Sequence, residues 1–253
     1  MTLIVFSGPT LPPAEAAKEL DALYMPPVSE GDVYRAALES PRAIGIIDGY
    51  FENVPSVWHK EILYALSRGI RVFGSASMGA LRAAELAQFG MQGVGATFEA
   101  FRDGRLEDDD EVAVIHGPAE LGYPMLSEAM VNIRRTLSDA HAGGVISSLT
   151  REGLEQIAKQ LPYRARAYHA ILSRGQAAGL AADELAQFKA WLPSGRIDQK
   201  REDAVLMLRV MRECLKPDSE ALSVAFHFEH TTLWEKAARM AVQGGDASLR
   251  AEV

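Results

Sequence analysis

The sequence predicts an α/β fold in the first half of the chain and an all-helical second half. Three short apolar runs, at residues 3–6, 43–47 and 70–73, end in turn residues as buried strands do. Strands that alternate with helices pair in parallel through right-handed crossovers. The first half is therefore expected to form an open, mostly parallel sheet with flanking helices. Beyond residue 126 only helical periodicity is found.

Helical patterns separate the expected strands. Residues 14–23 follow a pair of prolines, residues 33–38 follow an aspartate, and residues 56–67 begin at Ser56, which is a candidate N-cap. One further strand is expected at residues 112–115, where four apolar residues precede a histidine, a glycine and a proline.

The second half of the sequence consists of helical segments separated by glycine and proline. The expected helices span residues 126–142, 150–160, 164–174, 182–192, 199–214 and 231–242. Gly143 and Gly144 are the best candidate for a boundary, which predicts an α/β catalytic core at 1–143 and a helical region at 144–253. The mixed-charge stretch 200–204 is interpreted as a solvated helix face.

Composition narrows the class of protein. The chain has 253 residues, 48% of them hydrophobic, and a net charge of −8, which argues against a general nucleic-acid binder. Since no apolar run reaches the ~18 residues of a membrane helix, no membrane span is predicted. The N-terminus shows no secretory signal, and the expected location is the cytoplasm.

Neither a disulfide nor a metal is expected. Cys214 is the single cysteine, and the spacing of His227 and His230 does not fit a zinc motif. The acidic run 107–111 could suggest a cation site, but it is interpreted as a solvated turn. The loop after the first strand lacks the pattern of a phosphate-binding loop, so nucleotide binding is not predicted and no cofactor is expected.

A strand, a turn of small residues and a helix meet at Ser77. Ser75 and Gly79 flank Ser77 at two-residue spacing, which is a relaxed form of the G-x-S-x-G nucleophile elbow. Small neighbours allow the hydroxyl to point outward, and the N–H groups of Met78 and Gly79 at the helix start could stabilise an oxyanion. Serine is also a frequent N-cap, so a purely structural role for Ser77 stays open.

A nucleophilic serine needs a base, and two kinds are available. Lys60 falls in the first turn of the helix expected at 56–67, where the helix dipole disfavours a cation and would favour a neutral amine. An ordinary exposed lysine is the alternative. His116 is the rival base, in a Ser-His-Asp arrangement with an aspartate from 108–110.

The carboxyl ends of parallel strands share one edge of a sheet, where ligands bind in open α/β folds. The loops at residues 7–10 and 48–51 should therefore lie near Ser77. The N–H groups of Gly8 and Thr10 are candidate oxyanion donors. Asp48 could orient Lys60 or hold a substrate group, or it could simply cap its turn.

Five motifs together resemble the TfuA family. They lie at residues 6–10, 48–51, 59–62, 74–86 and 200–204, and the longest runs from Gly74 through Ser75-Ala76-Ser77-Met78-Gly79 to Leu86. The resemblance covers the α/β half well and the helical half more loosely.

The resemblance implies a function. TfuA-like proteins accompany YcaO enzymes in peptide-backbone thioamidation. They are understood to hydrolyse the thiocarboxylated C-terminus of a ThiS-like sulfur carrier, which releases sulfide, and to help the partner engage its peptide or protein substrate. Their Ser–Lys pair corresponds to Ser77 and Lys60, with Ser75 as an alternative nucleophile. A non-catalytic adaptor that docks the YcaO enzyme, carrier and substrate is the competing hypothesis.

Overall fold

The computed structural model describes residues 2–50, 54–215 and 223–248 and contains two compact units. The first unit consists of residues 1–105 and 201–253, and the second of residues 106–200. The predicted fold class is confirmed, because a parallel sheet with flanking helices is followed in the chain by a helical region. The boundary expected at Gly143 and Gly144 falls inside the second unit, between two of its helices.

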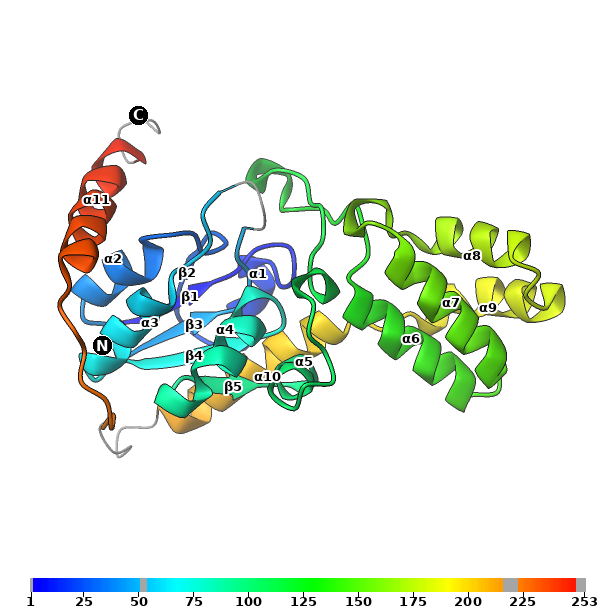
Figure 1. Ribbon diagram of the computed structural model, residues 1–253, viewed down its shortest axis with the longest axis horizontal. Helices are drawn as coiled ribbons and strands as arrows, with labels where there is room; N and C mark the ends of the chain where they lie inside the picture. The colour runs from blue at the N-terminus through cyan, green and yellow to red at the C-terminus, as the bar shows by residue number, and fades with distance from the viewer. Residues whose placement is uncertain (1, 51–53, 216–222, 249–253) are drawn as a thin grey trace. The chain divides into compact units, whose positions relative to one another are not determined.

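The first unit contains a five-stranded parallel sheet with the order β2-β1-β3-β4-β5 (Figure 1). The strands are β1 (Leu3–Phe6), β2 (Leu23–Met25), β3 (Ala43–Ile46), β4 (Arg71–Ser75) and β5 (Gln92–Val94). Of the four predicted strands, the first three correspond to β1, β3 and β4. Neither β2 nor β5 was predicted, and each is only three residues long. β2 is half-buried or exposed and begins where the helix expected at 14–23 was to end, and β5 is half-buried and has no apolar run.

A helix follows each strand of this sheet. These helices are α1 (Pro13–Ala16), α2 (Asp32–Leu38), α3 (His59–Ser67), α4 (Met78–Leu86) and α5 (Ala96–Arg102), with a 3₁₀ turn, η1 (Ala87–Phe89), after α4. Two more helices, α10 (Gln199–Cys214) and α11 (Thr232–Ser248), come later in the chain. The helix expected at 14–23 ends after a single turn. The N-cap of α3 is Trp58, so the prediction that Ser56 caps this helix is wrong.

The start of α4 makes direct backbone contacts with the sheet. A Cβ atom on Gly79 would lie 1.8 Å from the carbonyl oxygen of Ile46, and one on Gly74 would lie 2.2 Å from the carbonyl oxygen of Gly79. Only glycine allows backbones to approach this closely. The start of α4 is therefore fixed directly against β3 and β4.

The other face of the sheet is covered by α10. Met207, Leu208 and Met211 of α10 are fully buried in one cluster with Val5 and Phe73 of the strands. The stretch 200–204 at the start of this helix was expected to be a solvated face, and Arg201 and Glu202 are exposed as expected. The expectation was wrong for the residues on either side, since Lys200 is 1% exposed, Asp203 3% and Ala204 0%. Charge alone does not show whether a partner compensates for burial.

The second unit is built from helices. They are α6 (Met130–Ala142), α7 (Ser148–Gln160), α8 (Tyr168–Ala177) and α9 (Ala182–Gly195), with 3₁₀ turns η2 (Asp109–Glu111), η3 (Ala119–Leu121) and η4 (Tyr163–Ala165). Met130, Leu154 and Phe188 belong to its buried core. No strand forms at 112–115; within this stretch of the described chain there is irregular backbone, followed by a single bridge between His116 and Met125.

Ion pairs join the acidic run to the helices of the second unit. Glu111 is 2% exposed and binds Arg134 through both oxygens, and Arg166 is fully buried and binds Asp110. The ammonium of Lys159 lies 2.9, 2.5 and 2.9 Å from carboxylates of Asp108, Asp110 and Glu111. The interpretation as a solvated turn holds for residues 107–109, which are exposed, but not for Asp110 and Glu111, which are partly or fully buried in ion pairs. The lysine ammonium lies between the carboxylates where a cation would bind.

Among the described residues, none of the helices has both the length and the apolarity that crossing a bilayer requires.

Candidate functional site

The strand order places the candidate site at one edge of the sheet. In the order 2-1-3-4-5 the connections leave β1 and β3 in opposite directions, and ligands bind in the crevice that this creates at the carboxyl ends of the strands. The loop after β1 contains Gly8 and Thr10, and the loop after β3 begins with Ile47 and Asp48. All of these residues belong to the first unit.

Asp48 ties these two loops together. Its side chain is 2% exposed and accepts hydrogen bonds from the N–H groups of Gly8 (2.9 Å) and Thr10 (3.0 Å) and from the Thr10 hydroxyl (2.5 Å). The expectation that Gly8 or Thr10 offers a free N–H to an oxyanion is therefore wrong, because a carboxylate of the protein already occupies both donors. The carboxylate is engaged with the loop after β1 rather than with its own turn, a structural role that was not among those left open for Asp48.

The turn between β4 and α4 has a strained backbone. Ala76 has a φ angle of 65°, and the N–H of Ser77 donates to the carbonyl oxygen of Ser75 across it at 2.7 Å. A hydrogen bond from residue i+2 to residue i around a positive φ is the rare and strained γ-turn. Alanine pays a steric cost in this region that glycine would avoid. Strain of this kind concentrates at functional sites.

Ser77 occupies the N-cap position of α4 but does not cap it. Its side chain makes no capping hydrogen bond, and the residue is 8% exposed. The N–H of Gly79 donates to Ile47 (3.3 Å), so this expected oxyanion donor is engaged with the backbone. Met78 is the first residue of α4, and its N–H has no acceptor within the helix. The hydroxyl and this N–H are thus the groups that the turn offers to a ligand.

Ser75, the alternative nucleophile, lies at the end of β4. It is fully buried, and its hydroxyl donates to the carbonyl oxygen of Val94 in β5 at 2.8 Å. This hydrogen bond fixes the end of β4 to its neighbour. Ser77 is the better placed of the two serines, since its hydroxyl is not used in this way.

Lys60 lies in the first turn of α3, as expected, and its side chain contacts the C-terminal part of the first unit. Its Nζ atom lies 3.3 Å from Oγ1 of Thr231 and 5.3 Å from the ring centre of Phe228. Among the interactions of the described residues, none joins Lys60 to Ser77. In this conformation the amine is held by Thr231 and Phe228.

The histidines have other partners. His59 Nε2 lies 2.7 Å from Glu85 of α4, which also binds Arg82 at 2.8 Å. Burial would raise the pKa of Glu85, but the contacts with His59 and Arg82 outweigh it and leave the pKa below its ordinary value. His116 belongs to the second unit, where its Nδ1 atom lies 2.8 Å from the carbonyl oxygen of Gly117.

Sequence reasoning missed two buried carboxylates that organise helix starts. Glu61 accepts hydrogen bonds from Gly31, Tyr34 and Trp58, so one side chain serves the N-termini of both α2 and α3. Burial raises the pKa of Glu61, and the three N–H donors oppose this effect only in part. The spacing of Trp58 and Glu61 matches the second half of a capping box, which is the signal that could have identified it.

Asp203 is the second missed carboxylate. It accepts hydrogen bonds from the N–H groups of Ala96 and Thr97, both at 2.9 Å, and so stabilises the start of α5 directly after β5. Lys200, one turn earlier in α10, donates to the carbonyl oxygen of Val112 at 2.8 Å. The sequence alone did not show that Lys200 and Asp203 are both buried, because their hydrogen-bond partners lie far away in the chain.

Part of the chain matches a known protein family. A family model described as TfuA-like protein matches residues 48–167. Residues 48–167 belong to the TfuA-like family. The resemblance predicted from the motifs is thus confirmed, and the TfuA-like match supports a role associated with thioamidation in general.

The TfuA-like segment includes Asp48, Lys60, Ser75, Ser77 and the start of α4. It covers part of each unit and leaves out the loop at residues 6–10 and the stretch 200–204, which also contributed to the resemblance. Phe51, which was expected in the loop after β3, lies outside the described residues. No curated protein matches the chain.

Proposed function

We propose that this TfuA-like protein is a hydrolase that cleaves the thiocarboxylated C-terminus of a ThiS-like sulfur carrier and releases sulfide for a YcaO enzyme. Ser77 is the nucleophile and Lys60 is its base. The observation that carries this proposal is the strained turn before α4, where the Ser77 hydroxyl makes no capping hydrogen bond and lies next to Met78, whose N–H is the first of the helix. Nucleophilic serines occupy such turns because the helix N-terminus stabilises developing negative charge.

The reaction proceeds in two steps. The Ser77 hydroxyl attacks the thiocarboxyl carbon and passes its proton to the neutral amine of Lys60. The N–H of Met78 stabilises the resulting oxyanion. Protonated Lys60 gives its proton to the sulfur as the carbon–sulfur bond breaks, so that hydrosulfide leaves with the electron pair of that bond and the amine is neutral again. Water then attacks the acyl-serine with Lys60 as base, which gives the carboxylate of the carrier and restores Ser77. Hydrosulfide is a good leaving group, so modest activation of the serine suffices.

The direct test measures sulfide from a ThiS-like carrier converted chemically to its C-terminal thiocarboxylate. The variants Ser77→Ala and Lys60→Met are each expected to lower sulfide release by at least about 10³-fold, since nucleophile and base act as a unit. Ser75→Ala is the matched control and should retain most of the activity. Undiminished release by Ser77→Ala would refute the assignment.

One observation favours a second candidate function. Because Lys60 is held by Thr231 and Phe228, the base is not positioned at Ser77 in this conformation. A non-catalytic adaptor that binds the YcaO enzyme, the carrier and a peptide substrate would need no such base. A fluorophosphonate probe separates the two candidates: labelling that disappears in Ser77→Ala supports the hydrolase, whereas absence of labelling together with binding of a YcaO enzyme supports the adaptor. A cytoplasmic location is part of either proposal.

A further inference from the structure

Lys60 is held by residues near the C-terminus of the chain. We call residues 223–231 together with α11 the C-terminal arm. Thr231 accepts a hydrogen bond from the Lys60 amine at 3.3 Å, and the ring of Phe228, 8% exposed, lies 5.3 Å from it. A hydroxyl oxygen and the face of an aromatic ring both stabilise an ammonium ion. The arm therefore holds the amine through two contacts, one polar and one aromatic.

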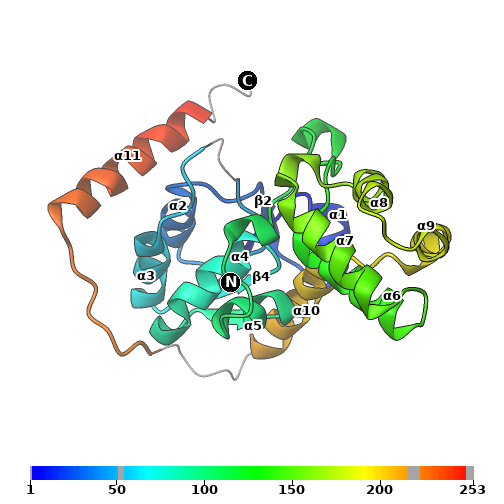
Figure 2. The same ribbon diagram turned by 45° about the vertical axis from the view of Figure 1, so that its right-hand side comes forward.

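A small aromatic cluster anchors the arm. The ring of Trp234 lies 5.2 Å from that of Tyr34 in α2 and 5.4 Å from that of Tyr64 in α3, and Phe228 lies 5.6 Å from Tyr64. Arg35 also donates to the carbonyl oxygen of Ala241 at 2.8 Å. In both views of the molecule α11 runs beside α2 (Figures 1 and 2).

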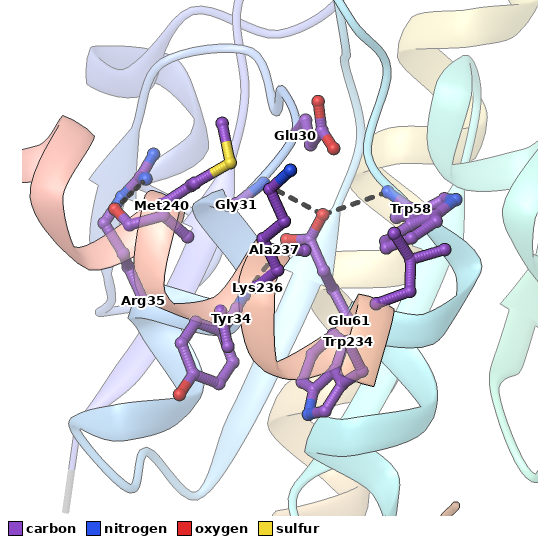
Figure 3. Close-up of a pocket in the computed structure, with 13 residues that line it drawn as sticks. Glu30, Gly31, Tyr34, Arg35, Trp58, Glu61, Trp234, Lys236, Ala237 and Met240 are labelled. Carbon is purple, nitrogen blue, oxygen red and sulfur yellow. Dashed lines mark hydrogen bonds between the residues drawn. The ribbon is translucent and has the colours of Figure 1, made fainter. Parts of the chain in front are cut away.

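Two hollows border the arm. A cavity of about 390 Å³ lies between α11 and the starts of α2 and α3, where Trp58 and Glu61 face Lys236 and Met240 (Figure 3). A second hollow of about 570 Å³ is lined by Tyr64, His230, Arg239 and Val242 among others. Among residues 232–243 of α11, Trp234 is the one buried side chain. The arm therefore buries little apolar surface compared with a core helix.

We infer that the C-terminal arm is an autoinhibitory strap that holds Lys60 away from Ser77 and releases it when the arm is displaced. This inference rests on the proposed function of Lys60 as the base. The Lys60 amine must leave Thr231 and Phe228 before it can take the proton of Ser77. The fraction of molecules with a free amine therefore limits the rate of the first step.

The test uses the full chain with the conservative double substitution Phe228→Leu and Thr231→Val. These changes keep both positions apolar or of similar shape. They remove the ring, which also packs on Tyr64, and the hydroxyl, which also accepts a hydrogen bond from the N–H of Trp234. Two quantities are measured: the rate at which acetic anhydride acetylates Lys60, followed by mass spectrometry, and the rate of sulfide release from the thiocarboxylated carrier. Glu229→Ala, at a side chain on the arm that is 77% exposed, is the matched control.

The double variant is expected to raise both rates about tenfold over wild type and over Glu229→Ala, as the loss of a cation–π contact and a hydrogen bond implies. Unchanged acetylation of Lys60 would overturn the inference, because the arm would then not sequester the amine. Faster acetylation with unchanged or slower sulfide release would also overturn it, since the arm would then not be inhibitory. Acetylation is measured without turnover, so failure of the proposed function, seen as activity in Ser77→Ala, is recognised separately.

Discussion

The side chain of Asp48 shows how a single residue holds the edge of the sheet. Its carboxylate accepts three hydrogen bonds from the loop after β1, two from N–H groups and one from a hydroxyl. Hydrogen bonds to a buried charge are about twice as strong as neutral ones, and donors left without acceptors carry a large desolvation cost. Asp48 thus contributes to stability and to the shape of the site at once.

Replacing Asp48 with alanine is expected to lower the free energy of unfolding by about 3 kcal/mol, because the N–H groups of Gly8 and Thr10 then lose a buried acceptor. Asp48→Asn retains one oxygen and should cost less. Urea denaturation measures both effects. A loss under about 0.5 kcal/mol in Asp48→Ala would contradict this assignment, since exposed donors are compensated by water.

At the scale of the elements, the contact between α4 and the sheet determines where Ser77 lies. Gly79 allows the helix start to touch the carbonyl of Ile46, and Gly74 allows the strand to touch the carbonyl of Gly79. Neither neighbour is the flexible end of a side chain, so neither can move without moving a strand or a helix. The elbow is therefore as rigid as the sheet itself.

Gly79→Ala is expected to destabilise the protein by about 3 kcal/mol, because the new methyl group would lie 1.8 Å from a backbone oxygen and force α4 away from β3. The same shift moves Ser77, so sulfide release should fall as well. Thermal unfolding and the sulfide assay check the two effects. Gly153→Ala in α7 is the control: its nearest neighbours are the flexible methyl groups of Leu180, and a change within about 1 kcal/mol is expected.

At the scale of the whole molecule, the second unit depends on ion pairs that titrate together. Burial alone would raise the pKa values of Asp110 and Glu111. Hydrogen bonds from Lys159 and Arg166 to Asp110, and from Arg134 and Lys159 to Glu111, outweigh burial and lower both pKa values. A carboxylate with a lowered folded-state pKa stabilises the fold above its unfolded pKa, and this contribution is lost as the pH falls through the folded-state value.

The variant Lys159→Met is therefore expected to be less stable than wild type by about 2 kcal/mol at pH 7, because three carboxylates lose their shared cation. The difference should shrink below about pH 4, where the carboxylates become protonated in both proteins. Urea denaturation across a pH series measures it. Lys189→Met, at an exposed position of α9, should show no such dependence on pH. A difference that stays constant down to pH 2 would contradict the ion-pair explanation.

Some parts of the fold and the site were predictable from the local sequence pattern, and others depend on contacts between residues far apart in the chain. β1, β3 and β4 were predictable because each is a short, buried apolar run, whereas β2 and β5 form only because neighbouring strands supply their hydrogen-bond partners. The elbow at Ser77 was recognisable from its small residues. The sequence did not show that the N–H groups of Gly8, Thr10 and Gly79 are hydrogen-bonded, because their acceptors lie about 30 to 40 residues away in the chain.

The sequence by itself determined the fold class, the strand–turn–helix at Ser77 and the resemblance to the TfuA-like family. All of these depend on residue type and short spacing, which tertiary contacts do not alter. Only the tertiary structure decided which charges are buried and which polar groups are engaged. Lys60 bound by the C-terminal arm, Asp48 by the first loop and Lys159 by three carboxylates each depend on partners that are distant in sequence. The free energy of a charge depends on what surrounds it in space, and local pattern does not contain that information.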